Sequence, residues 1–173
     1  MYLETERLIL RDFSISDFDD LYKIFGDDEV MKNCAPTYNK TETENLLSDF
    51  CISRSGAFAL VSKKDRKVIG YVLFNSIEEP EIFEIGWFIN KNYWRKGYTF
   101  EISSRLISYG FEEMKLHKIS AETTDEVKSI PLMKKLGMKL EGIQRKHSKS
   151  IDGSWCDLYW YAILENDYFG NKL

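Results

Sequence analysis

The pattern of hydrophobic and polar positions predicts a strand followed by a helix at the start of the chain. Residues 6–13 alternate between apolar and polar side chains, which is typical of a strand with one buried face. In residues 16–25 the apolar side chains recur at helical spacing and form one face: Phe18, Leu21, Tyr22 and Phe25. Ser16 and Asp19 have the spacing of a capping box at the start of this helix, and Gly26 ends it.

A second helix and a meander of three strands are expected next. Thr41 and Glu44 repeat the capping-box spacing, and they precede a helical stripe made of Leu46, Leu47, Phe50 and Cys51. Three alternating runs separated by polar turns then predict strands at residues 57–63, 67–77 and 82–90.

The second half of the chain predicts further helices and strands. The expected elements are a helix over residues 98–115, a strand over 119–124, a helix over 130–136, and a hairpin turning at Asp152-Gly153. The resulting order, β-α-α-β-β-β-α-β-α-β-β, predicts a mixed α/β (α+β) fold with helices on both faces of one sheet. It excludes the regular alternation of a Rossmann domain, because three strands follow one another directly.

Composition narrows the class of protein. A chain of 173 residues with 43% hydrophobic and 30% charged residues suits one globular domain spanning residues 1–173. It has no apolar run near the ~20 residues that span a bilayer, and acidic residues stand where a signal peptide needs basic ones. We therefore expect a cytoplasmic protein without membrane contact. The net charge of −4 argues against nucleic-acid binding, and three scattered cysteines with two distant histidines predict neither a disulfide framework nor a metal site.

The most informative stretch is residues 84–101, EIGWFINKNYWRKGYTFE, where a strand leads through a basic loop into a helix. The first turn of a helix leaves backbone N–H groups unpaired, and the helix dipole favours anions there. Arg95 and Lys96 add positive charge, and Gly97 allows close approach of the backbone to a ligand. These features predict a pyrophosphate cradle, although an ordinary strand-loop-helix connection has the same pattern. Neither a Walker loop nor a G-x-G-x-x-G motif is present.

Four segments, in order along the chain, resemble the GNAT (Gcn5-related N-acetyltransferase) family, and within it the RimJ/RimL-like ribosomal-protein N-acetyltransferases. The segments are LETERLILR at residues 3–11, YWRKGYTFE at 93–101, SIPLMKKLGMKLEG at 129–142 and DGSWCD at 152–157. Three positions depart from the usual pattern of these enzymes: Arg95 replaces a small glycine, Thr99 replaces glycine or alanine, and Glu126 replaces an asparagine.

The resemblance implies a mostly antiparallel central sheet that splays open after its fourth strand, with acetyl-CoA in the opening and no metal. The residues that it places against the donor are Phe88, Ile89, Asn90, Trp94, Arg95, Lys96, Gly97, Tyr98, Thr99 and Ser129. It implies direct transfer of an acetyl group to a primary amine in a ternary complex.

Two residues are the candidate catalytic groups. Glu84 is the candidate general base, because burial in an apolar strand would raise its pKa; a solvent-facing Glu84 is the alternative, and Glu122 is its competitor. Ser129 matches the serine that this branch places near the thiol, and capping a helix is its alternative role. Met133 stands near the position of a tyrosine acid in many GNAT enzymes and cannot donate a proton.

The acceptor is left open among a protein N-terminus, a polyamine and another small cationic amine. Acidic residues in the first helices and two late tryptophans would suit a cation, although helix caps and solvated faces explain the acids equally: Asp17, Asp19, Asp20, Asp27, Asp28, Glu29, Trp155 and Trp160. The alternatives are a non-catalytic acyl-CoA-binding sensor or regulatory module, and a nucleotide- or phosphate-binding module. Exposed strands of the last hairpin make a homodimer an open expectation.

Overall fold

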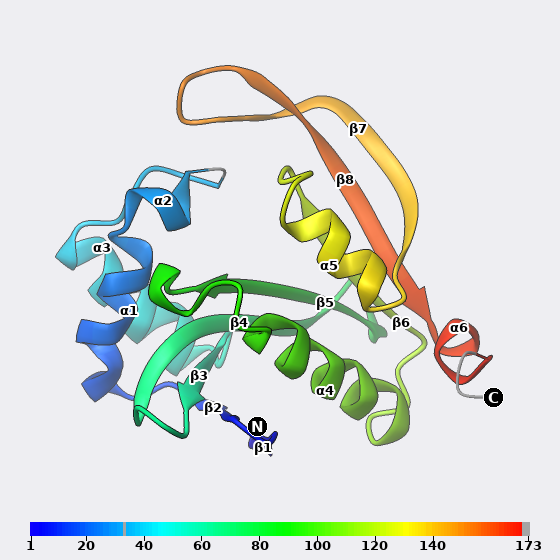
Figure 1. Cartoon of the computed structure of the whole chain (residues 1–173), viewed down its shortest axis with the longest axis horizontal. Helices are drawn as coiled ribbons and strands as arrows, with labels where there is room; N and C mark the ends of the chain where they lie inside the picture. The colour runs from blue at the N-terminus through cyan, green and yellow to red at the C-terminus, as the bar shows by residue number, and fades with distance from the viewer. Residues whose placement is uncertain (33, 171–173) are drawn as a thin grey trace.

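The computed structural model describes residues 1–32 and 34–170 (Figure 1). Within these residues eight strands form one sheet in the order β1-β2-β3-β4-β5-β6-β8-β7, and the β5–β6 pair alone is parallel. The strands are β1 (Leu3–Glu4), β2 (Leu8–Asp12), β3 (Phe58–Ser62), β4 (Lys67–Ile77), β5 (Glu79–Ile89), β6 (Lys118–Thr123), β7 (Lys139–Lys149) and β8 (Trp155–Leu164).

Helices connect the strands at both ends of the sheet. The α-helices are α1 (Phe18–Phe25), α2 (Asp28–Met31), α3 (Lys40–Asn45), α4 (Tyr98–Glu112), α5 (Ser129–Lys135) and α6 (Glu165–Gly170). Two short 3₁₀ helices, η1 (Ile15–Asp17) and η3 (Lys91–Tyr93), and a π-helical segment, η2 (Leu46–Ser53), complete the set. In the part of the chain that the structure describes, no helix has the length and apolar character needed to cross a bilayer.

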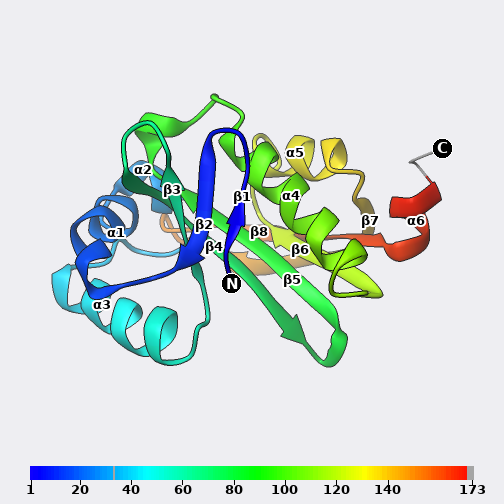
Figure 2. The same ribbon diagram turned by 90° about the horizontal axis from the view of Figure 1, so that it is seen from below.

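The helices cover both faces of the sheet, as the sequence predicts. On one face α4 and α5 bury Ile102, Leu106 and Met133 against strand residues such as Leu60 and Ile85. On the other face α1, α2 and η2 form a second core; its members include Leu21, Ile24, Phe25, Met31, Leu47, Cys51 and Tyr71. Figure 2 shows the two groups of helices on opposite sides of the strands. The predicted fold class is therefore confirmed.

Both predicted capping boxes are displaced by two residues. The first box joins Ser14 to Asp17, whose Oδ2 accepts from the Ser14 N–H at 2.8 Å. The second joins Asn39 to Glu42, whose Oε2 accepts from the Asn39 N–H at 2.7 Å. In each case the cap is the residue whose backbone is still extended, whereas Ser16 already lies within η1.

Several other elements differ from the prediction: β5 begins at Glu79, three residues before the predicted start, and the short helix α2 was not predicted. Helix α4 ends at Glu112, three residues before the predicted end, and Met114 beyond it is 37% exposed. The short strand β1 was not predicted, because two residues are too few to show alternation. The predicted hairpin is confirmed: β7 and β8 pair along most of their length, and Gly153 occupies the turn with a φ of 85°. In Figure 1 this hairpin arches over α5 and reaches toward α2.

Candidate active site

Strand β5 separates from β6 partway along its length. In the described residues, the parallel register joins Ile82, Phe83 and Glu84 to residues 118–120, whereas β5 continues to Ile89 with β4 as its one partner. The predicted splay of the sheet therefore lies after Glu84. This geometry exposes one edge of β5 to a ligand that can bond to backbone.

The orientation of the β5 backbone follows from its pairing with β4. The Asn90 N–H donates to the Ile69 carbonyl at 2.9 Å, so it faces β4. Since alternate residues of a strand turn their backbone groups to the same side, Phe88 also faces β4, and Trp87 and Ile89 face the opening. The Ile89 carbonyl already accepts from Trp94 Nε1 at 2.7 Å. The backbone of Trp87 and the Ile89 N–H are thus the groups on this edge that a donor arm would meet.

The loop after β5 has the backbone shape of an anion cradle. Arg95 and Gly97 both lie in the left-handed region, with φ of 59° and 79°. A glycine is favoured at such positions, which agrees with the glycine that the family resemblance leads one to expect where this chain has Arg95. Helix α4 begins directly after Gly97, and the N–H groups of its first turn have no acceptor within the helix. The exposed side chains of Arg95 and Lys96 place positive charge beside these amides.

The loop is fastened to the start of the chain by side chains that the sequence analysis missed. Arg7 Nη1 donates to the Lys96 carbonyl at 2.9 Å, and its guanidinium lies 4.5 Å from the centre of the Tyr98 ring. The same guanidinium bonds Glu101 of α4 at 2.6 Å. Thr5 Oγ1 donates to the other carboxylate oxygen of Glu101 at 2.6 Å. The sequence contains one signal for these contacts. Residues 3–11 form one of the segments that resemble the GNAT family, but the resemblance assigns no role to Thr5 or Arg7.

Burial raises the pKa of Glu101, but its hydrogen bonds have the larger combined effect. The donors are the Thr5 hydroxyl, the Arg7 N–H and the Arg7 guanidinium, and together they lower the pKa below its usual value. Glu101 is therefore an anion at neutral pH. Its charge is matched by the guanidinium of Arg7.

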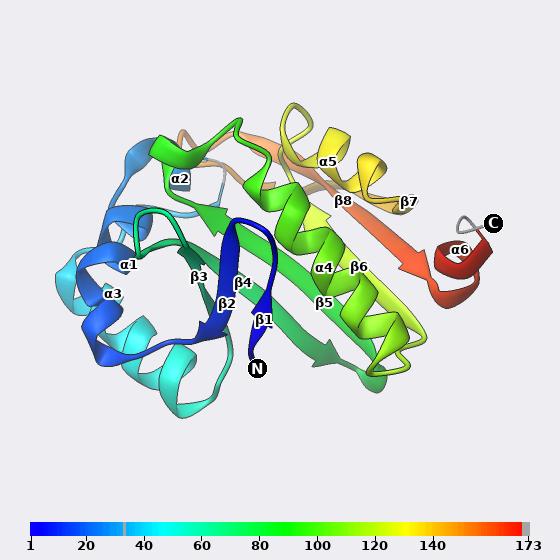
Figure 3. The same ribbon diagram turned by 60° about the horizontal axis from the view of Figure 1, so that its bottom comes forward.

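Two lysines at the start and the end of α5 contact aromatic rings of the loop and of α4. Lys128 Nζ lies 4.1 Å from the centre of the Trp94 ring, and Lys135 Nζ lies 4.2 Å from that of Phe100. Figure 3 shows α4 and α5 on the same side of the sheet. Ser129 is the first residue of α5, and its hydroxyl has no hydrogen-bond partner among residues 1–32 and 34–170.

The alternative role of Ser129 as a helix cap is wrong. Lys128 occupies the N-cap position of α5. Asp125 bonds the amides just before the helix, where its Oδ1 accepts from Val127 and Lys128 at 3.0 and 2.9 Å. The Ser129 hydroxyl is therefore available to a ligand. The carboxylate of Glu126 lies near the Tyr159 hydroxyl of β8 and raises the pKa of that tyrosine.

Glu84 lies on the opposite face of β5 from α4. It shares a face with Phe88, whose ring contacts Phe25 of α1 at 5.0 Å, while Ile85 belongs to the core beneath α4. Glu84 is half-buried. Burial raises its pKa, and the nearby carboxylate of Glu122 raises it further. The competing candidates Glu84 and Glu122 thus lie close enough to interact, on the face of the sheet away from the cradle.

The acids of the first helices have structural partners. Asp17 forms a two-pronged ion pair with Arg11, at 2.7 and 2.8 Å. Asp27 caps α2 and binds Lys91 Nζ at 2.9 Å. The alternative reading of these acids as caps therefore holds for Asp17 and Asp27. Trp155 lies far out on the hairpin and is exposed.

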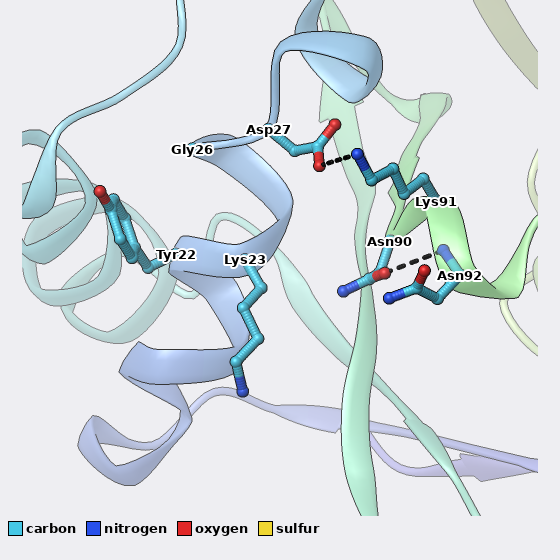
Figure 4. A pocket seen from close by; sticks show the side chains of 7 residues that line it. All are labelled: Tyr22, Lys23, Gly26, Asp27, Asn90, Lys91 and Asn92. Atoms are coloured by element: carbon cyan, nitrogen blue, oxygen red, sulfur yellow. Dashed lines mark hydrogen bonds and ion pairs between the residues drawn. The ribbon is translucent and has the colours of Figure 1, made fainter.

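A cavity of about 290 Å³ lies between the end of α1 and the start of the loop (Figure 4). Among the residues that line it, Asp27 and Lys91 form an ion pair, and Asn90 Oδ1 accepts from the Asn92 N–H at 3.0 Å. Its lining residues are Tyr22, Lys23, Gly26, Asp27, Asn90, Lys91 and Asn92. It adjoins the cradle through Asn90 but does not include residues 94–99.

A cysteine nucleophile is disfavoured by the environment of Cys51. Its side chain is 2% exposed within the core beneath α1. Burial raises the pKa of the Cys51 thiol to about 12, so it is protonated at neutral pH.

Comparison with known proteins identifies the family. The model of the acetyltransferase (GNAT) domain matches residues 7–139. The N-acetyltransferase YnaD of Bacillus subtilis (strain 168) is 32% identical over 170 residues, which cover 97% of this chain and 99% of YnaD. A GNAT-family acetyltransferase from Bacillus anthracis has a solved structure with a TM-score of 0.87 and 31% identity, covering 96% of this chain and 99% of that one.

A more distant structure shares the fold. The spermidine N-acetyltransferase from Vibrio cholerae, solved with CoA and spermine, has a TM-score of 0.81 and 21% identity, with coverage of 95% and 99%. The chain described here belongs to the GNAT acetyltransferase family. It is an N-acetyltransferase, and acetyl-CoA is the donor that this family uses.

Proposed function

We propose that the whole chain, residues 1–173, acts as one domain that transfers an acetyl group from acetyl-CoA to a primary amine in a ternary complex. The observation that carries the proposal is the meeting of three features at one place. The free edge of β5 beyond Glu84 runs into a loop with two left-handed residues, and that loop opens into the N-terminus of α4. Such an arrangement can bind an extended amide chain that ends in a pyrophosphate.

The residues of this region fit coenzyme A. There is open space around Gly97, since a Cβ built there would meet one nearby atom, Arg7 Nη2, at 3.5 Å. The first-turn amides of α4, with Arg95 and Lys96, would hold the pyrophosphate, and the β5 edge at Trp87 and Ile89 would pair with the pantetheine amides. Trp94, Tyr98 and Thr99 complete the predicted donor site, whereas Phe88 and Asn90, which were also predicted there, turn their backbone groups toward β4. Acetyl-CoA, when bound, supplies an acetyl group activated as a thioester.

Glu84 and Ser129 supply the proton chemistry in this proposal. An amine is a nucleophile only after it loses a proton, and Glu84, with its raised pKa, is a suitable acceptor directly or through water. The Ser129 hydroxyl, which has no partner in the described part of the chain, can donate a hydrogen bond to a sulfur atom. The buried thiol of Cys51 supports direct transfer rather than a covalent acyl-enzyme.

A cationic amine is the acceptor class that the charges support. Glu84 and Glu122 interact on the face away from the cradle, where their carboxylates would attract an ammonium group. The four sequence segments support membership of the RimJ/RimL-like branch and hence a protein N-terminus. A polyamine or another small cationic amine meets the same charge requirement.

Binding of the donor tests the proposal first. Thermal unfolding is measured with acetyl-CoA, with ATP as the control ligand, and without ligand. At 100 times its dissociation constant, acetyl-CoA should stabilise the protein by about 2.7 kcal/mol, which raises the Tm by about 5–10 °C. An equal or larger shift with ATP would favour the nucleotide-binding alternative, and no shift with acetyl-CoA would contradict the donor site.

A further inference from the structure

The side chain of Arg7 contacts the loop that forms the cradle and the first turn of α4 at three points in all. Its Nη1 donates to the Lys96 carbonyl, its guanidinium covers the Tyr98 ring, and the same group pairs with Glu101 one turn into α4. Thr5 Oγ1 and the Arg7 N–H hold the second carboxylate oxygen of Glu101, at 2.6 and 3.0 Å. The start of the chain is therefore joined to both sides of Gly97.

The bond to the Lys96 carbonyl fixes a particular peptide plane. In a trans peptide the C=O of one residue and the N–H of the next point in opposite directions. When Arg7 holds the Lys96 carbonyl, the Gly97 N–H is turned away from Arg7. Gly97 has no Cβ to resist rotation of this peptide, and its φ of 79° is one that a flexible loop would leave readily.

Arg7 also balances a charge that would otherwise oppose an anionic ligand. Glu101 lies in the first turn of α4, beside the amides of the cradle. It accepts hydrogen bonds from the Thr5 hydroxyl and from the Arg7 guanidinium. The helix dipole stabilises a carboxylate at this position, but the carboxylate repels a pyrophosphate. The guanidinium at 2.6 Å neutralises it.

From these contacts we propose that Arg7 is a positioning residue for the donor: it turns the Gly97 amide into the cradle and neutralises Glu101, without itself belonging to the catalytic groups. The inference rests on the proposed function, because it assumes that the loop binds the pyrophosphate of coenzyme A. Its consequence is specific. Arg7 should matter for ligands that contain the pyrophosphate and not for ligands that lack it.

The test compares binding of coenzyme A and pantetheine by isothermal titration calorimetry, which requires no acceptor amine. In Arg7→Gln, the dissociation constant of coenzyme A should rise about tenfold or more, as for the loss of a charged hydrogen-bond network. That of pantetheine should change less than about twofold. Arg105→Gln is the matched control, because Arg105 pairs with Glu113 at 3.0 Å on the same helix but away from the loop. It should bind both ligands like the unmodified protein.

A double substitution separates the two parts of the proposal. If charge alone explains the loss, Glu101→Gln should restore coenzyme A binding in Arg7→Gln; positioning of the peptide predicts that at least part of the loss remains. Arg7→Lys keeps the charge and loses the fork of donors, so it should show an intermediate loss and serves if Arg7→Gln fails to fold.

Each outcome has a distinct meaning. Failure of the unmodified protein to bind coenzyme A would contradict the proposed function itself. Normal binding by the unmodified protein together with normal binding by folded Arg7→Gln would overturn the role of Arg7. Equal losses for coenzyme A and pantetheine would also overturn it, since they would indicate a general structural defect.

Discussion

Substitution of Gly97 separates the conformational role of this residue from its place in the anion cradle. Gly97 has a φ of 79°, and a Cβ at this position would lie 3.5 Å from Arg7 Nη2, an ordinary contact. The cost of Gly97→Ala is therefore backbone strain rather than a clash. The left-handed conformation costs about 1–2 kcal/mol for a residue with a Cβ, and reduced freedom of the unfolded chain offsets about 0.4–1 kcal/mol of that.

We expect Gly97→Ala to lower the Tm by about 2–4 °C, because the net loss is about 1 kcal/mol in a chain of this size. Its affinity for coenzyme A should fall only slightly, since the backbone N–H groups remain. Gly97→Glu adds a carboxylate beside the pyrophosphate. Two unit charges about 5 Å apart repel by about 3 kcal/mol at an effective dielectric constant of 20, which corresponds to about a hundredfold loss of affinity or more.

The assay is calorimetric titration with coenzyme A, together with thermal unfolding of each variant. Gly142→Glu in β7 is the matched control, because a Cβ there meets nothing within 4 Å and the site lies outside the loop. It should bind coenzyme A normally. If folded Gly97→Glu bound coenzyme A as tightly as the control, the assignment of this loop as the cradle would be refuted. A loss in Gly97→Ala as large as in Gly97→Glu would assign the effect to loop geometry instead of charge.

Two further substitutions test the proton chemistry. In Glu84→Gln, kcat should fall by about a hundredfold or more, as for removal of a general base. In the unmodified enzyme kcat/KM should fall as the pH is lowered through the pKa of Glu84, which lies above its ordinary value. In Glu84→Gln this acidic fall of kcat/KM should be lost. If the variant kept the same acidic fall, Glu84 would be excluded as the base. Ser129→Ala should lower kcat about tenfold while acetyl-CoA affinity stays within about twofold, as measured by steady-state kinetics and titration; unchanged turnover would remove Ser129 from the proton chemistry.

The order of elements could be predicted from the sequence because burial on each face leaves a clear periodicity. In α4, for example, Ile102 and Leu106 are fully buried on one side, at the spacing of one helical turn. The same pattern fixes β4 and β5 as neighbours, and with them the place of the loop. The position of Arg95, Lys96 and Gly97 at the start of a helix followed directly.

The capping residues could not be assigned in the same way. The segment around Ser14, Ser16, Asp17 and Asp19 offers several pairs with capping-box spacing, and the side chains alone do not distinguish them. The choice depends on where the chain leaves β2, and the extended backbone of Ser14 makes it the cap. The pairing of β2 with β3 sets where the chain leaves β2, and this pairing joins segments about fifty residues apart.

The contacts of Thr5 and Arg7 with Glu101 and with the loop could not be predicted from the sequence for the same reason. Arg7 and Glu101 lie 94 residues apart, so no local pattern links them. The electrostatic link between Glu84 and Glu122 likewise depends on the parallel pairing of β5 with β6. Sequence periodicity predicts which face of an element is buried, but contacts between charged groups on distant elements require the folded chain.

The central claim is most directly tested by mixing the protein with acetyl-CoA and a panel of amines: peptides with free N-termini, polyamines and aminoglycosides. Release of free thiol is followed in solution, and each amine is examined by mass spectrometry for one added acetyl group. The account predicts thiol release that depends on an amine, with acetylation of that amine and a rate lower by about a hundredfold or more in Glu84→Gln at the same pH. Tight binding of acetyl-CoA without transfer to any member of a broad panel would contradict the account and favour a non-catalytic acyl-CoA sensor.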